Sequence, residues 1–198
     1  MLLYGNCSAF EKTTKLNFDQ LIAKYVTGNW TTSDLPKLGL AGLQQGLDSE
    51  SLVILAGLSD KDNSFEIKQY FDKTLEELQI NLPDKRTAAI ELAVFYAQEI
   101  VDKRMDPIDG TWKIINYCLR SYDFYGETKN YVMDSIGFEN AYGLYYTYDD
   151  LKDADHAWST SKTNDELKEE VKVELIEELK DWIGKIKTTR QSSRRLRP

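Results

Sequence analysis

The sequence predicts an all-α fold, a multi-helix single domain around a central apolar helix, with an irregular tyrosine-rich segment and a long amphipathic C-terminal helix. The chain has 198 residues and only four prolines, and it is rich in Leu, Ala, Glu and Lys, which favour helices. Residues 84–103 are apolar on nearly every side, which is typical of a helix that others surround. Residues 165–187 carry apolar side chains at helical spacing on one face.

Four shorter helices are predicted before the central one, over residues 17–27, 33–46, 48–57 and 64–80. Asn17 can cap the first, and Gly28 can end it in a left-handed turn. Gly39 and Gly42 weaken the second helix, and we expect them to let another helix approach closely.

The third and fourth helices each follow a residue that can accept a hydrogen bond from backbone N–H groups. We predict Asp48 and Ser64 as these N-caps, and Gly57 as the end of the third helix. The inner face of the fourth helix is predicted to comprise Phe65, Ile67, Phe71, Leu75 and Leu78.

Residues 99–115, EIVDKRMDPIDGTWKII, place three aspartates close together. We interpret them as a helix boundary. Asp102 falls in the last turn of the central helix, Asp106 is the N-cap of the next one, and Pro107 takes its first position. Asp109 then meets the positive end of the helix dipole, and Gly110 belongs to the same structural turn. The alternative is a carboxylate- or metal-dependent hydrolase site built from Asp102, Asp106 and Asp109.

Trp112, Ile115 and Leu119 are predicted to continue inward from this turn. Beyond them, short helices are expected near 127–135 and 138–152. The domain is predicted to span 1–187, and residues 188–198 to form a basic, disordered tail with four arginines and no acid.

Composition narrows the classes of function. The formal net charge is −8, which disfavours nucleic-acid binding except through the basic tail. There is no C-x-x-C pair, no secretion signal and no apolar run of about 20 residues. We therefore expect a cytoplasmic protein with free thiols and no membrane association.

Catalytic and metal-binding motifs are lacking. The single histidine, His156, lies in DADHAW with no nucleophile motif nearby. Residues 60–71 have Phe65 and Phe71 where a calcium loop needs glycine and glutamate. No phosphate-loop, Rossmann or zinc-protease motif occurs. We predict no catalytic residue, metal site or cofactor.

The most unusual segment is 117–155, which holds eight of the twelve tyrosines and is acidic. Tyrosine offers contact area with little loss of entropy, and neighbouring carboxylates can steer a basic partner. The alternative is that these tyrosines are half-buried edges of the core. The predicted partner-binding residues are Tyr142, Tyr145, Tyr146, Tyr148, Asp149, Asp150 and Asp153.

Three blocks within residues 33–116 resemble a family of uncharacterised bacterial all-helical proteins. They are LQQGLDSESLVILAGL, LEELQINLPDKRTAA and AQEIVDKRMDPIDGTWKI, with a GLDSxSLxxLAGL block and an IVxxxxDPxxG turn. The resemblance implies an all-helical fold and no transferable catalytic residue. Small bacterial proteins of this kind often occur among immunity proteins that neutralise toxins, so the resemblance also implies, by analogy, an immunity-type role.

The leading hypothesis is a non-enzymatic, immunity-like binding protein that engages a basic protein through the acidic tyrosine-rich face. The hydrolase is one alternative. The other is a scaffold or oligomeric structural protein whose tail binds nucleic acid.

Overall fold

The computed structural model describes residues 16–153, 158 and 161–195, and the polypeptide is all-α over these residues. The eight α-helices of this part of the chain are α1 (Phe18–Val26), α2 (Leu35–Gln44), α3 (Glu50–Gly57), α4 (Ser64–Glu77), α5 (Lys85–Val101), α6 (Pro107–Lys113), α7 (Glu139–Asp153) and α8 (Asn164–Arg195). Short helical turns join them: η1 (Thr32–Asp34), the π-helical turn η2 (Ile114–Cys118), η3 (Leu119–Ser121) and η4 (Asp134–Ile136). The all-α, single-domain prediction is confirmed.

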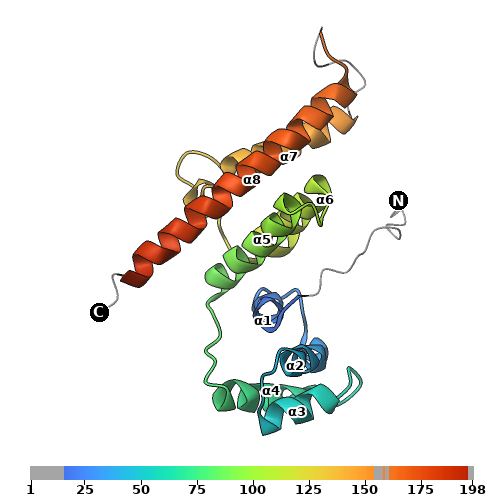
Figure 1. Ribbon diagram of the computed structural model, residues 1–198, viewed down its shortest axis with the longest axis vertical. Coiled ribbons are helices and arrows are strands. Elements are labelled where there is room, and N and C mark those ends of the chain that lie inside the picture. Colours follow the sequence, from blue (N-terminus) through green and yellow to red (C-terminus); the bar gives the residue numbers. More distant parts are fainter. Residues whose placement is uncertain (1–15, 154–157, 159–160, 196–198) are drawn as a thin grey trace.

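Two groups of buried side chains make up the core. One lies among α1 to α4 and includes Leu38, Leu55 and Phe71. The other lies among α5 to α8. Helix α1 sits between the two groups (Figure 1), with most of its buried side chains in the first and Ala23 in the second. The helices therefore form four layers. Helices α2 to α4 make the first layer, α1 the second, α5 with α6 the third, and α7 with α8 the fourth.

The central apolar helix is confirmed as α5, which packs against α1, α6, η2 and α8. Asp84 caps it, accepting a hydrogen bond from Thr87 N at 2.8 Å. Each large aliphatic side chain buried in this way contributes about 1.5–3 kcal/mol. However, α5 is the centre of the second group only, because the first contains no α5 residue. Its fully or nearly fully buried residues are Ala88, Ala89, Leu92, Ala93, Ala97 and Ile100.

Two glycines bring α2 close to its neighbours, as predicted. A Cβ at Gly39 would lie 2.8 Å from Ala56 N in α3, and one at Gly42 would lie 2.9 Å from the Phe18 ring. Only glycine permits these approaches without a shift of the backbone or ring.

Two predicted N-caps are wrong by one residue. Ser49, not Asp48, caps α3 and accepts from Leu52 N at 3.2 Å. Asn63, not Ser64, caps α4 and accepts from Phe65 N at 2.9 Å. Both caps have extended backbone, as an N-cap requires. The neighbouring residue types suit a cap equally well, so the sequence could not separate them.

Two aromatic residues predicted to point inward are exposed. Phe65 is 77% exposed, because it lies two positions before buried Ile67 and therefore about 200° around the helix from it. Trp112 is 42% exposed, because the buried face here includes its neighbour Thr111, and adjacent helical residues point about 100° apart. Ile115 and Leu119 are buried, as predicted.

The helix expected near 127–135 is a loop with only the short turn η4. The Asp134 carboxylate accepts hydrogen bonds from the backbone N–H groups of Asn130 at 2.7 Å and Tyr131 at 3.0 Å. Met133 has φ +68° and is buried. The carboxylate satisfies N–H groups that a helix would otherwise have paired, so the loop is stable without one.

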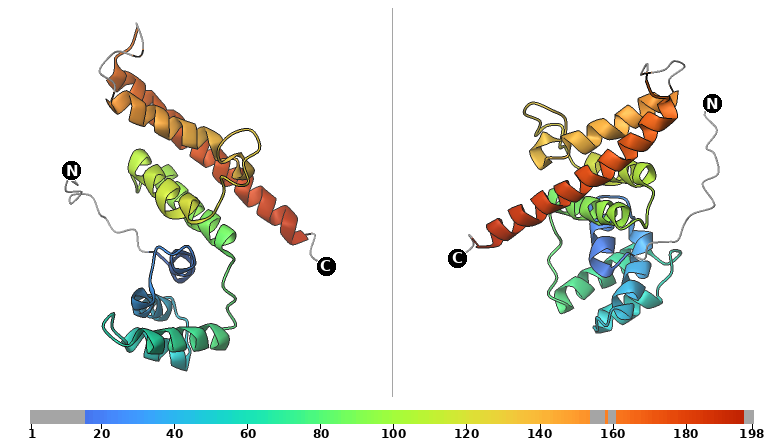
Figure 2. Two further views of the ribbon diagram at one scale, coloured as in Figure 1. Left: turned by 180° about the vertical axis from the view of Figure 1, so that it is seen from behind. Right: turned by 45° about the horizontal axis from the view of Figure 1, so that its top comes forward.

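Helix α8 runs beside α7 and crosses α5 (Figures 1 and 2). Trp182 anchors it: the side chain is fully buried against Phe138, and Nε1 donates to Ile136 O at 2.8 Å. The helix ends at Arg195, not near Lys187. Residues 188–195 therefore extend α8 and do not form the disordered tail that we expected.

Candidate protein-binding surface

The predicted tyrosines lie along α7, and three of them are half-buried against the core. Tyr146 packs on Tyr142 with ring centroids 4.8 Å apart and on Tyr145 at 5.3 Å. Tyr142 Oη is 2.9 Å from Tyr125 Oη. These rings attach α7 to the body of the protein, as the alternative interpretation expected.

Burial raises the pKa of Tyr142, and its hydrogen bond with Tyr125 raises it further. Burial also raises the pKa of Tyr145, with Asp149 as the next cause. Both hydroxyls therefore stay protonated at neutral pH and can donate or accept hydrogen bonds. Neither is suited to act as a base near pH 7.

The remaining predicted residues lie toward the C-terminal end of α7. Tyr148 is half-buried beneath Lys172 of α8, whose Nζ is 5.6 Å from the ring centroid. Asp149 and Asp150 are exposed, and Asp153 is the last residue of the helix. No cation among the described residues lies within ion-pair distance of Asp149 or Asp150.

Helix α8 adds an acidic stripe that the sequence analysis did not assign to the site. Its exposed positions recur every three or four residues, and an exposed Val173, at 64%, lies among them. Glu170 pairs with Lys162 at 2.6 Å and Glu177 with Lys180 at 3.5 Å. Glu174 and Asp181, by contrast, have no ion-pair partner among the described residues. The stripe consists of Glu166, Glu170, Val173, Glu174, Glu177 and Asp181.

Together, the two helices form what we call the acidic hairpin, α7 with α8 up to Lys187. Helix α7 has four acids against one lysine, and this part of α8 has eight acids against five lysines. Because the helices lie side by side (Figure 2), their charges add to one local negative field. The sequence analysis treated these two consecutive helices separately, and their side-by-side packing is what joins the acids of α8 to those of α7.

The three aspartates of the 99–115 stretch are held in separate structural roles. Asp106 Oδ1 accepts from Ile108 N at 2.9 Å and Asp109 N at 3.0 Å, which confirms the predicted cap. Pro107 is the first residue of α6, and Asp109 is its third. Asp102 pairs with Arg104 at 2.7 Å.

Gly110 has a packing role in the same turn, since a Cβ there would lie 2.5 Å from Ile100 Cγ1. Arg104 also holds Glu99, donating to both carboxylate oxygens at 3.0 Å. Asp106 is thus bonded to two backbone N–H groups, and Asp102 and Glu99 are paired with one arginine, while Asp109 is exposed. These bonds argue against a shared catalytic site of the three aspartates, and the hydrolase alternative stays a prediction. Within the described residues, no three His, Cys, Asp or Glu side chains form a group that could hold a metal ion.

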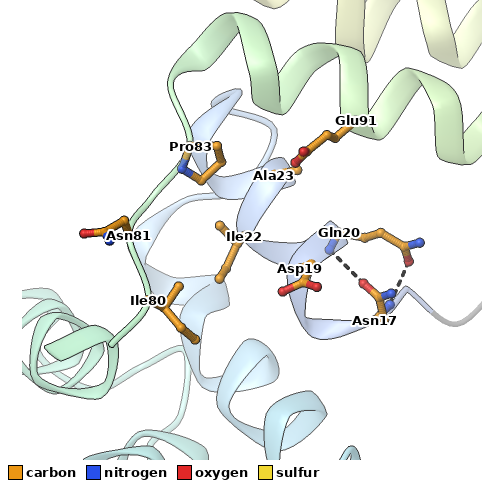
Figure 3. Close-up of a pocket in the computed structure, with 9 residues that line it drawn as sticks. All are labelled: Asn17, Asp19, Gln20, Ile22, Ala23, Ile80, Asn81, Pro83 and Glu91. Carbon is orange, nitrogen blue, oxygen red and sulfur yellow. Dashed lines mark hydrogen bonds between the residues drawn. The ribbon is translucent and has the colours of Figure 1, made fainter. Parts of the chain in front are cut away.

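A cavity of about 410 Å³ lies between α1, the 80–83 segment and α5 (Figure 3). Two acids, Asp19 and Glu91, contribute to its lining. Asn17 and Gln20 also line it, but they bond each other's backbone N–H groups in a capping box. No histidine, cysteine, serine or threonine is among its lining residues, so the cavity offers no hydroxyl, thiol or imidazole nucleophile.

Of the two cysteines and the single histidine, one cysteine lies within the described residues. Cys118 is buried and free, and burial raises the pKa of its thiol, so it is unreactive. His156 and Cys7 lie outside the described residues. In the part of the chain that the structure describes, every helix is too short or too polar to cross a bilayer.

Comparison of the chain with protein-family models, with curated proteins and with solved structures finds no match. The resemblance to the bacterial helical family therefore stays a prediction.

Proposed function

We propose that this protein is a non-enzymatic binding module that engages a basic protein partner through the acidic hairpin. The observation that carries the proposal is that exposed carboxylates on both helices have no cation within ion-pair distance among the residues that the structure describes. Asp149 and Asp150 on α7 and Glu174 and Asp181 on α8 are all of this kind. A basic surface would supply the missing cations and would be steered toward them during association.

The tyrosines have a supporting role in this proposal. Their rings hold α7 in place, so the carboxylates are presented on a pre-organised helix rather than on a loop. Pre-organisation limits the entropy lost on binding. Exposed Val173 adds an apolar contact within the stripe.

By analogy with the helical bacterial proteins that the 33–116 blocks resemble, the partner is a basic toxin and the role is immunity. We place this function in the cytoplasm, because a reducing compartment keeps thiols such as that of Cys118 free.

Charge reversal on the hairpin tests the proposal. Asp149→Lys with Asp150→Lys, and separately Glu174→Lys with Asp181→Lys, should each weaken binding of a co-purified basic partner by about tenfold or more. The matched control is Glu66→Lys with Glu76→Lys on α4, which makes the same change in net charge at exposed sites far from the hairpin. Affinity can be measured by titration calorimetry at two salt concentrations. Equal affinities for the hairpin variants and the wild type would show that this surface is not the interface.

A further inference from the structure

A second surface has the opposite character to the acidic hairpin. It combines three partly or largely exposed aromatic side chains with two lysines, and we call it the Trp/Lys patch. Its members come from the end of α1 and the turn after it, and from α6 and the π-turn. They are Lys24, Trp30, Trp112, Lys113 and Tyr117.

Contacts between the two segments make the patch continuous. Asn29 Nδ2 donates to Tyr117 O at 2.5 Å, which ties the turn after α1 to the π-turn. The Trp112 and Tyr117 rings meet edge to face with centroids 5.2 Å apart. On the other side, Lys24 Nζ lies 5.4 Å from the centre of the Trp30 ring.

Backbone geometry fixes these groups in place. The N–H groups of Asn29 and Trp30 both donate to Lys24 O, at 3.0 and 3.2 Å, so the turn is folded back onto α1. On the other segment, Asn116 Nδ2 donates to Trp112 O at 2.9 Å. A π-turn is rare and occurs frequently at functional sites. Here it leaves Tyr117 39% exposed while Cys118 is buried.

The two lysines lack acidic partners. Neither Lys24 nor Lys113 has a carboxylate within ion-pair distance among the described residues, although the chain has 33 acids. Both are half-buried. Burial lowers the pKa of Lys24; Asp34 opposes this effect and Lys113 adds to it. These two half-buried lysines have no ion-pair partner among the described residues and lie beside half-buried Trp30 and exposed Trp112, so a ligand that supplies negative charge would be favoured there.

We infer that the Trp/Lys patch is a docking site for an acidic peptide segment of a partner protein, in which carboxylates pair with Lys24 and Lys113 and an apolar side chain packs on Trp112 and Tyr117. Trp and Tyr are the residues that most often dominate binding energy at protein interfaces. A nucleic acid is a poorer occupant, because two lysines can pair with only two phosphates of a polyanion that the net charge of −8 repels along its whole length, whereas a short peptide brings only a few carboxylates. None of the five residues of the patch belongs to the acidic hairpin, and the patch fits an acidic partner whereas the hairpin fits a basic one.

Selection from a random peptide library displayed on phage, with the full chain as bait, tests the inference. We expect the enriched peptides to be rich in Asp and Glu and to contain an aromatic or aliphatic residue. A synthetic copy of an enriched peptide should bind the chain, and its affinity should fall as salt is raised. Enrichment of basic peptides, or of none, would overturn the proposal.

Substitutions within the Trp/Lys patch test whether that peptide binds there. Lys24→Gln with Lys113→Gln should weaken it by about tenfold or more, which corresponds to about 1.4 kcal/mol. Lys61→Gln with Lys85→Gln changes the net charge equally at exposed sites elsewhere and should leave the affinity unchanged. Trp112→Ala removes an exposed ring and should weaken binding without lowering the melting temperature.

Three further results would each contradict the inference. One is equal affinity of both lysine variants for the peptide. Another is tighter binding of single-stranded oligo-dT than of the peptide, lost in the Lys24/Lys113 variant, which would assign the patch to nucleic acid. The third is self-association in sedimentation that the same variant abolishes, which would make a second copy of the chain the occupant.

Discussion

At the scale of single residues, short polar side chains decide where helices begin. Asn17, Ser49, Asn63, Asp84 and Asp106 each accept a hydrogen bond from a backbone N–H group in the first turn of a helix. Such groups have no partner within the helix itself. Acidic residues that look catalytic in the sequence therefore have a structural explanation when a helix start is close by.

Replacing Asp106 by alanine should remove the cap of α6 and lower the free energy of unfolding by about 1 kcal/mol. Asp106→Asn should retain most of the stability, because its amide oxygen can still accept from Ile108 N and Asp109 N. Urea denaturation of both variants measures this. Equal losses for the two would mean that the charge, rather than the acceptor oxygen, matters at this position.

Asp134 should make stability depend on pH in the acid range. Hydrogen bonds from Asn130, Tyr131 and Lys129 hold the pKa of this carboxyl below its usual 3.8. A lowered pKa in the folded state stabilises the protein above the unfolded-state pKa, and this stabilisation disappears as the pH falls through the folded-state pKa. Asp134→Asn should therefore be less stable than wild type at pH 7. The difference should shrink progressively below about pH 4, as followed by urea melts over a pH series, and a constant difference would contradict the assignment.

At the scale of elements, helix positions follow from periodicity and caps, whereas helix neighbours do not. The central position of α5 in the second group of buried side chains could be predicted because apolar side chains cover nearly its whole circumference. The exposure of Trp112 could not, because the small residues Gly110 and Thr111 occupy the buried face of α6, and small or polar residues do not mark an inward face in the sequence. The spacing of acidic residues in α8 could be read from the sequence. That α8 packs beside α7 could not, because it depends on tertiary packing.

Two glycine-to-alanine substitutions in helices should have opposite effects. Gly39→Ala would place a Cβ 2.8 Å from Ala56 N and should destabilise the α2–α3 contact by about 1–3 kcal/mol. Gly184→Ala in α8 meets no atom within 4 Å and should stabilise by about 0.5–1 kcal/mol. Thermal unfolding of the two variants checks this. Destabilisation of equal size at both sites would show that the close approach of α2 to α3 is not what requires Gly39.

At the scale of the whole molecule, α1 joins the two groups of buried side chains. Leu16 and Val26 pack against both groups, and Ala23 belongs to the second while Phe18 belongs to the first. The stacking of helices in Figure 1 thus rests on one short shared helix. We expect the two groups to unfold together.

Leu55→Ala, in the first group, should lower stability by about 2–5 kcal/mol. If the molecule unfolds as one unit, hydrogen exchange of the slowest amides in α5 should accelerate as much as that of amides in α3. Acceleration confined to α1–α4 would mean that the two groups unfold independently.

The central proposal is that the acidic hairpin binds a partner. Hydrogen exchange of the full chain, measured with and without a bound basic partner, distinguishes this surface from the rest of the molecule. We expect binding to slow exchange in residues 139–153 and 164–187, with little change in α2–α4. Protection that falls instead on α2–α4, with the hairpin unchanged in the complex, would contradict it.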